Sequence, residues 1–85
     1  MSSRTNKIGI IKGIEDLIIT PKGTPIIKIL FKENEGHAYY VQFQNEKVHL
    51  ADDLQKGQKV KISYVARGGS KSKITNLIVQ NIEKI

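Results

Sequence analysis

Apolar and polar residues alternate along most of this chain. Between residues 7 and 20, Ile8 and Ile10 alternate with a lysine and a glycine, and an apolar run ends the segment. A two-residue period predicts a strand. Gly13 lies where a long strand would bend or bulge. Residues 20–25, with two prolines and a glycine, predict a loop.

Two further alternating runs, residues 26–32 and 37–44, flank a turn at residues 34–36 and predict a hairpin. The residues predicted to face the interior are Ile27, Ile29, Phe31, Tyr39, Val41 and Phe43. Those predicted to face outward are Lys28, Lys32, Ala38, Tyr40, Gln42 and Gln44. A slip of one residue would reverse both faces of a strand, so Tyr39 and Tyr40 are alternatives for the outward-facing ring.

Residues 45–55 break the alternation and predict a short helix. Apolar residues recur there at helical spacing, Asn45 is a candidate N-cap, and Gly57 is a candidate for the residue that ends the helix. Two last strands follow at residues 58–66 and 74–82. Val60, Ile62 and Tyr64 share the inward face of the first, while Asn76 and Leu77 interrupt the alternation of the second.

The composition agrees with a sheet protein, because isoleucine, valine, threonine and aromatic residues dominate the apolar set. The order of three strands, a short helix and two strands predicts an all-β protein. It is the order of a five-stranded Greek-key barrel, the OB-fold, with a short helix between strands three and four. The 85 residues suffice for one domain, with residues 1–6 expected to be a flexible N-terminus.

The charge favours polyanionic partners. Fourteen lysine and arginine residues against eight acidic ones give a formal net charge of +6. The chain has no cysteine, no apolar run long enough to span a membrane and no signal peptide. We therefore expect a cytoplasmic protein without membrane contact, metal or cofactor.

Three segments resemble the bacterial single-stranded DNA-binding protein family. Residues 7–13 resemble its glycine-containing first strand, residues 54–62 the glycine turn and alternating strand that follow its helix, and residues 74–82 its last barrel strand. The resemblance implies single-stranded DNA as the ligand, and members of that family often form oligomers by strand pairing. Unlike many members, this chain has no tryptophan and ends at the barrel without an acidic tail. A role in recruiting partner proteins is therefore not expected.

OB-folds bind single strands on the face of strands two and three and in the flanking loops, using cations for phosphates and flat side chains for bases. Tyr40 is the candidate for base stacking, and its alternative role is to cover the sheet. Arg67 is a candidate for stacking or phosphate pairing. The full predicted set is Lys22, Lys28, Lys32, Tyr40, Gln42, Lys59, Lys61, Arg67, Lys71 and Lys73.

Two other functions use the same surface. RNA binding is the first alternative, and a protein-assembly module that contacts its partner through a sheet face or strand edge is the second. Catalysis is not expected. His37 and His49 are isolated, Asp52 and Asp53 would point to different sides of a helix, and no nucleophile or phosphate-loop motif is present.

Overall fold

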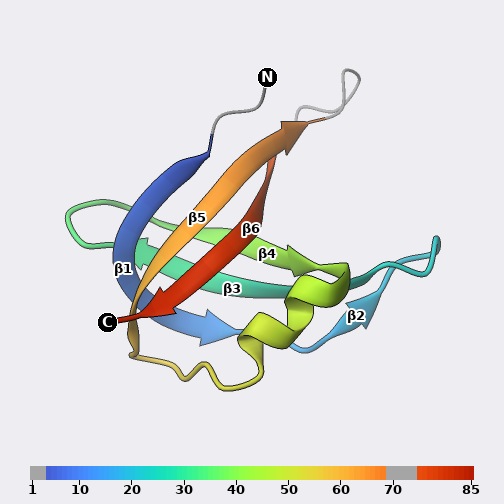
Figure 1. Cartoon of the computed structure of the whole chain (residues 1–85), viewed down its shortest axis with the longest axis horizontal. Helices are drawn as coiled ribbons and strands as arrows, with labels where there is room; N and C mark the ends of the chain where they lie inside the picture. The colour runs from blue at the N-terminus through green and yellow to red at the C-terminus, as the bar shows by residue number, and fades with distance from the viewer. Residues whose placement is uncertain (1–3, 69–74) are drawn as a thin grey trace.

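The computed structural model describes residues 4–68 and 75–85, which form six strands and one short 3-10 helix (Figure 1). The strands are β1 (Thr5–Ile14), β2 (Ile18–Ile19), β3 (Pro25–Glu33), β4 (Ala38–Gln44), β5 (Lys59–Gly68) and β6 (Thr75–Lys84), and the helix is η1 (Asn45–Ala51). The predicted order of elements is confirmed. The start of the chain differs in two ways: β1 begins two residues earlier than predicted, and the strand predicted at residues 7–20 is divided into β1 and β2.

The strands pair into a closed ring. Their order is β1-β5-β6-β4-β3-β2, and β1 also pairs with β3, which closes the ring. The pairings are antiparallel except that of β4 with β6, where Gln42 lies opposite Ile78. Closure provides hydrogen-bond partners for backbone N–H and C=O groups that would be unpaired in an edge strand. The short β2 remains at the end of the strand order.

β1 serves two neighbours because it bends. Its residues 5–10 pair with β5, and residues 9–14 pair with β3. The register with β3 shifts between Ile11 and Gly13, so Lys12 forms a bulge beside the glycine that the pattern marks as a bend. A bulge turns the strand sharply, which lets one strand join both sides of the ring.

Gly9 is the glycine that the close approach of β3 requires. A Cβ at this position would lie 2.0 Å from the carbonyl oxygen of Lys32 and 2.8 Å from the ring of Phe31. At Gly13 the nearest atom to an added Cβ would be 3.9 Å away. The sequence pattern singles out Gly13, whereas the packing makes Gly9 the position that excludes any side chain.

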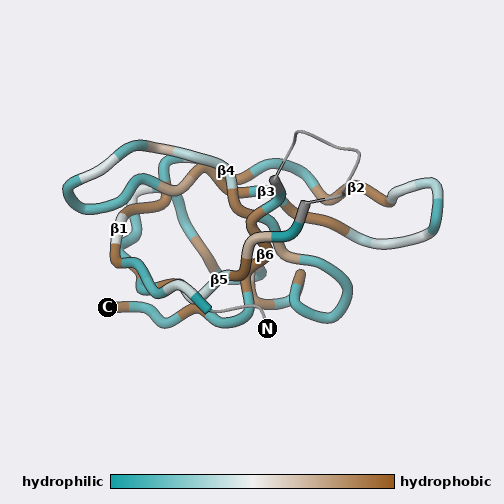
Figure 2. The backbone as a smooth tube through the Cα atoms, turned by 90° about the horizontal axis from the view of Figure 1, so that it is seen from above, coloured by the Kyte–Doolittle hydropathy of each residue, from teal (hydrophilic) through white to brown (hydrophobic). Residues whose placement is uncertain are grey.

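The inward-facing residues of the ring form the core. The residues predicted to face inward in 26–32, 37–44 and 58–66 lie in the core or pack against it. On the opposite faces Ile26, Gln42 and Val65 are buried as well, which the alternation did not predict. Figure 2 shows apolar stretches along the strands with hydrophilic residues in most connections. Each fully buried aliphatic or phenylalanine side chain contributes about 1.5–3 kcal/mol of transfer free energy. The largest fully buried side chains are Phe31, Phe43, Ile11, Ile29, Ile62, Val41, Val60 and Val79.

η1 packs against the core with the residues that have helical spacing. Ala51 and Leu54 are buried in the core cluster, and Val48 and Leu50 pack against it. The predicted apolar stripe therefore has the predicted role, although the helix is 3-10 in geometry and ends at Ala51. In the part of the chain described, no helix is long and apolar enough to cross a membrane.

The predicted caps of this helix are wrong. The cap position is occupied by Gln44, which makes no side-chain cap hydrogen bond, and Asn45 is the first helical residue with φ 55°. Asparagine tolerates this left-handed conformation better than most residues. Gly57, with φ 89°, lies beyond the end of the helix in the turn that precedes β5.

The irregularity in β6 lies further along than predicted. Asn76 and Leu77 keep regular register with β5, opposite Arg67 and Ala66. The register shifts instead at Gln80, which has no partner between the pairs Ser63–Asn81 and Tyr64–Val79.

Candidate nucleic-acid interface

The outward surface of β3 and β4 has Tyr40 near its centre. The Tyr40 side chain is 52% exposed and lies opposite Leu30 of β3. Lys28 and Lys32 flank Leu30 at two-residue spacing, and both are exposed. An exposed ring between two cations is the combination that a single strand needs for its bases and phosphates. We call this surface the β4 face; it comprises Lys28, Leu30, Lys32, Tyr40, Gln42 and Gln44.

Tyr39 faces the interior, which leaves Tyr40 as the outward-facing ring. The Tyr39 ring packs edge-on against Phe31, with centroids 5.9 Å apart, and its hydroxyl lies 3.2 Å from that of Tyr64. Burial, followed by the hydrogen bond to Tyr64, raises the pKa of Tyr39 above its ordinary range. The alternative register, with Tyr39 outward, is therefore excluded.

Gln42 has the predicted orientation but little exposed surface. Its register places it between Lys28 of β3 and Ile78 of β6, and its side chain is 6% exposed. The prediction of an accessible binding residue is wrong in this respect. The physical reason is that β4 is paired on both sides at this position, so Gln42 lies within the sheet rather than at its edge.

Lys59 and Lys61 are exposed on β5, but on another part of the ring. They lie opposite Ile10 and Ile8 of β1, and Lys32 of β3 lies opposite Ile10 from the other side. Ile8 and Ile10 are 42% and 36% exposed. We call these five residues the β1 patch. β6 separates β5 from β4. The predicted binding residues of the sheet therefore lie on two surfaces, the β4 face and the β1 patch, which share Lys32.

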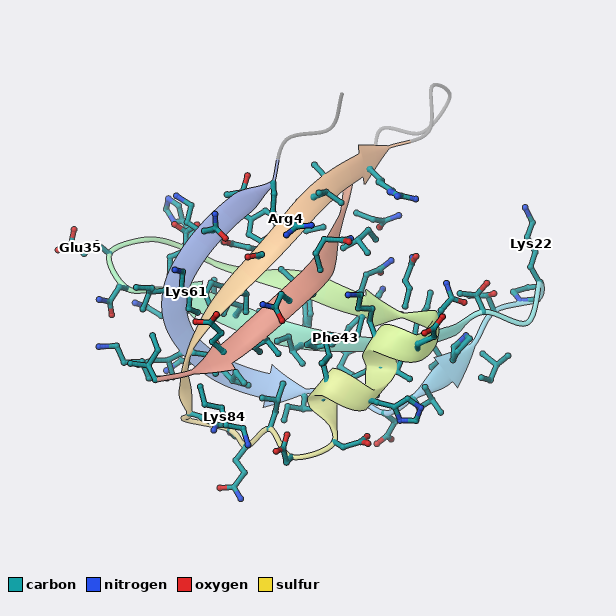
Figure 3. The ribbon with its side chains drawn as sticks, viewed as in Figure 1. Arg4, Lys22, Glu35, Phe43, Lys61 and Lys84 are labelled. Carbon is teal, nitrogen blue, oxygen red and sulfur yellow. The ribbon has the colours of Figure 1, made fainter. Side chains whose placement is uncertain are left out.

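The remaining predicted cations lie in or beside loops. Lys22 extends from the loop between β2 and β3, at the far end of the molecule from Lys61 (Figure 3). Arg67 is exposed near the end of β5, opposite Asn76. The predicted contacts Lys71 and Lys73 lie outside the described residues.

A pocket that the sequence did not predict lies where β4 passes into η1. Its volume is about 290 Å³, and it faces the irregular position Gln80 of β6. The Lys47 ammonium donates a hydrogen bond to the carbonyl oxygen of Gln80 over 2.7 Å, which links the start of η1 to β6. The lining residues are Gln44, Asn45, Glu46, Lys47, Arg67, Ile78, Val79 and Gln80. Of these lining residues, the sequence pattern marks only Asn45 and Arg67 for a role, Asn45 as a candidate helix cap and Arg67 as a candidate contact to nucleic acid.

An apolar segment is exposed between β1 and β3. Leu17, Ile18 and Ile19 are 53%, 52% and 61% exposed. The sequence pattern predicts them as the continuation of the first strand. The ring closes without them, because β1 leaves it at Ile14 and only the two-residue β2 continues along β3.

The described residues contain no group of three His, Cys, Asp or Glu side chains arranged to hold a metal ion. His49 lies 3.4 Å from Asp52, and both side chains are exposed. Asp53 instead accepts a hydrogen bond from the Lys84 ammonium, which lowers the pKa of its carboxyl group. This ion pair joins the end of β6 to the turn after η1 and lies apart from the β4 face.

Known proteins resemble this chain in structure but not in sequence. No protein-family model matches the chain, and no curated protein matches its sequence. Among solved structures, Rim1, the mitochondrial single-stranded DNA-binding protein of S. cerevisiae, is 14% identical with a TM-score of 0.84, over 100% of this chain and 97% of that one. PriB of Ralstonia solanacearum is 14% identical with a TM-score of 0.74, over 95% of each chain. The second single-stranded DNA-binding protein of Mycobacterium smegmatis, SSBb, is 12% identical with a TM-score of 0.71, over 99% of this chain and 89% of that one. At these identities the likeness concerns the fold, and the chain has the OB-fold seen in single-stranded DNA-binding proteins.

Proposed function

We propose that the protein binds single-stranded DNA, largely without regard to sequence, through the β4 face. The observation that carries the proposal is the ring of Tyr40, 52% exposed and flanked on β3 by Lys28 and Lys32. The fold supports it, because Rim1 and SSBb, which share the fold, are single-stranded DNA-binding proteins.

The chemistry of this face suits a flexible polyanion. One base stacks on Tyr40, and the sequence tolerance follows because every base has a π-face. Lys28 and Lys32 pair with phosphates on either side of the stacked base, and Leu30 supplies apolar contact beneath it. Gln42 is buried in the β4 face, so we assign it a supporting role in that surface rather than a direct contact to the strand.

The other predicted cations extend the path of the strand. Arg67 continues the face across β6, and Lys22 lies in the loop that precedes β3. Lys59 and Lys61 lie on β5 and belong to the β1 patch rather than to the β4 face, so we assign them a secondary, electrostatic role. Lys71 and Lys73 remain predicted phosphate contacts.

A titration followed by fluorescence anisotropy tests the proposal. The probes are labelled oligo-dT, a duplex DNA and an RNA of matched length, each at about 50 mM and about 200 mM salt. We expect oligo-dT to bind more tightly than the duplex, and its affinity to fall steeply with salt as phosphate counterions are released. Absence of oligo-dT binding at the lower salt concentration would overturn the proposal.

RNA is the alternative ligand for the same face, because stacking on Tyr40 and phosphate pairing do not require deoxyribose. Competition between matched DNA and RNA strands separates the two. Preferential displacement of bound oligo-dT by RNA would assign the face to RNA.

Self-assembly is a second candidate function, favoured by the exposed Ile8 and Ile10 of the β1 patch. Two copies that contact each other here would remove both side chains from water, while the flanking lysines would oppose contact at low salt. Light scattering after size-exclusion chromatography at low and high salt measures the expected oligomer. A monomer at both salt concentrations would contradict it.

The proposed role is binding without catalysis. Its support is the fold, which is that of the single-stranded DNA-binding proteins Rim1 and SSBb. The cytoplasmic location stays a prediction.

A further inference from the structure

We infer that the pocket between β4 and β6 receives one base of the bound strand edge-on, and that it favours bases with an exocyclic amino group. The inference rests on the proposed function and adds a base preference at one position of an otherwise sequence-tolerant site.

The pocket lies on the path that the β4 face defines. Tyr40, Gln42 and Gln44 share the outward face of β4, and Gln44 lines the pocket. At about 3.3 Å per residue, Tyr40 and Gln44 are about 13 Å apart along the strand. A single strand that stacks one base on Tyr40 and continues along β4 therefore brings a later base to the pocket. Arg67, on β5, lines the same pocket.

The size and the polarity of the pocket fit a single base. A volume of about 290 Å³ lies just below the range of roughly 300–1,000 Å³ for drug-sized ligands, as suits a single base. The amide groups of Gln44, Asn45 and Gln80 each offer a donor and an acceptor, the two functions that base edges present. Arg67 adds a planar cation that stacks on a base or pairs with its phosphate.

Glu46 sets the preference among bases. An ionised carboxylate only accepts hydrogen bonds. The exocyclic amino group of cytosine or adenine donates to it, whereas O4 of thymine is itself an acceptor and is opposed by it. Within the described residues, no ion pair engages the Glu46 carboxylate. Its oxygens therefore remain available to a base.

Two features of the backbone hold the pocket in shape. Gln80 lies outside the β5–β6 register, and its carbonyl oxygen accepts the 2.7 Å hydrogen bond from Lys47. Asn45 takes the left-handed conformation, φ 55°, between β4 and Glu46. The backbone that carries the side chains of Asn45, Glu46 and Gln80 is therefore held in place where β4 passes into η1 beside β6.

Oligo-dC and oligo-dT of equal length are the test ligands, because the two pyrimidines differ mainly in the amino or carbonyl group at position 4. Anisotropy titrations at one salt concentration give the ratio of their dissociation constants. We expect oligo-dC to bind roughly 5- to 150-fold more tightly, the range for one well-placed base-edge contact.

Glu46→Gln identifies the source of the preference. A carboxamide presents a donor or an acceptor according to its orientation, so we expect the ratio to fall towards one. Glu35→Gln is the matched control: it removes the same charge from the exposed turn between β3 and β4, where Figure 3 places Glu35 at the far end of the molecule from the loop of Lys22. The control is expected to strengthen binding of both oligomers equally and leave the ratio unchanged.

The outcomes are distinguishable. Equal binding of oligo-dC and oligo-dT by the unmodified protein overturns this inference and leaves the proposed function standing. A preference that Glu46→Gln and Glu35→Gln reduce to the same extent overturns it too. Failure of the protein to bind either oligomer overturns the proposed function and, with it, the inference.

Discussion

The hydroxyl oxygens of Tyr39 and Tyr64 meet inside the ring at a distance of 3.2 Å. Tyr39 belongs to β4 and Tyr64 to β5, and β6 lies between these strands in the order of the ring. Their rings also pack edge-on, with centroids 6.1 Å apart. The contact therefore crosses the interior and joins two strands that share no backbone hydrogen bonds.

Tyr39→Phe tests the energetic role of this contact through pH. Burial and the bond to Tyr64 raise the pKa of Tyr39 in the folded protein above its ordinary value of about 10. The folded state keeps a proton that the unfolded chain loses, so the stability due to this difference is full below about pH 10 and declines as pH rises further. We expect a smaller alkaline decline in Tyr39→Phe, measured by urea denaturation at about pH 9 and about pH 11. Lysine titration is common to both proteins, and an identical decline in both would contradict the prediction.

Gly9→Ala should destabilise the ring strongly. The added Cβ would lie 2.0 Å from the carbonyl oxygen of Lys32, which belongs to the backbone of β3 and cannot swing aside. We expect a loss of about 1–3 kcal/mol or more in the free energy of unfolding. Gly13→Ala is the control in the same strand, where the nearest atom would be 3.9 Å away. The control should be neutral or stabilising by up to about 1 kcal/mol, because alanine restricts the unfolded chain. Equal losses in the two variants would contradict the close approach.

Tyr40→Ala should weaken oligo-dT binding without unfolding the protein. Loss of one stacked base costs about 1–3 kcal/mol, which corresponds to a roughly 5- to 150-fold rise in the dissociation constant. The side chain is 52% exposed, so little core packing is lost. Tyr40→Phe keeps the ring and should keep most of the affinity. Unchanged affinity in Tyr40→Ala would remove Tyr40 from the site.

Lys28→Gln should reduce the salt dependence of binding. Each phosphate neutralised on a single strand contributes about −0.7 to the slope of log affinity against log salt. Loss of one such contact makes the slope shallower by that amount. Lys56→Gln is the control, because Lys56 is exposed on the turn before β5 and lies outside the β4 face. A slope changed equally by both variants would indicate a general charge effect rather than a phosphate contact.

Lys84→Gln should raise the pKa of Asp53 back towards its ordinary value. The hydrogen bond from Lys84 is the main cause of the lowered pKa. Stability from a lowered carboxyl pKa is present above the unfolded value and is lost as pH falls through the folded value. Titration of the Asp53 carboxyl by NMR measures the shift in both proteins. An unchanged pKa in Lys84→Gln would show that the pair does not persist in solution.

The sequence by itself determined which residues face the interior. In a half-buried strand apolar and polar residues alternate, because one face of the strand packs on the core and the other faces water. The apolar positions of the pattern therefore mark the inward face. Phe31, Phe43 and Ile62 therefore have the predicted positions in the core. The order of elements followed as well, because turns and the break in period at residues 45–55 are local features.

Only the tertiary structure decided which outward residues are neighbours. The alternation of apolar and polar residues separates inward-facing from outward-facing side chains. In a closed ring, however, the outward-facing side chains of different strands point in different directions. Lys61 therefore lies on the β1 patch, away from Tyr40, although both face outward. Gln42 is buried where β4 is paired with strands on both sides, and the close approach of the β3 backbone to β1 leaves no room for a side chain at Gly9. The pocket beside Glu46 exists because β4, η1 and β6 meet there. Contacts of this kind join residues that are far apart in the chain, and no local pattern contains them.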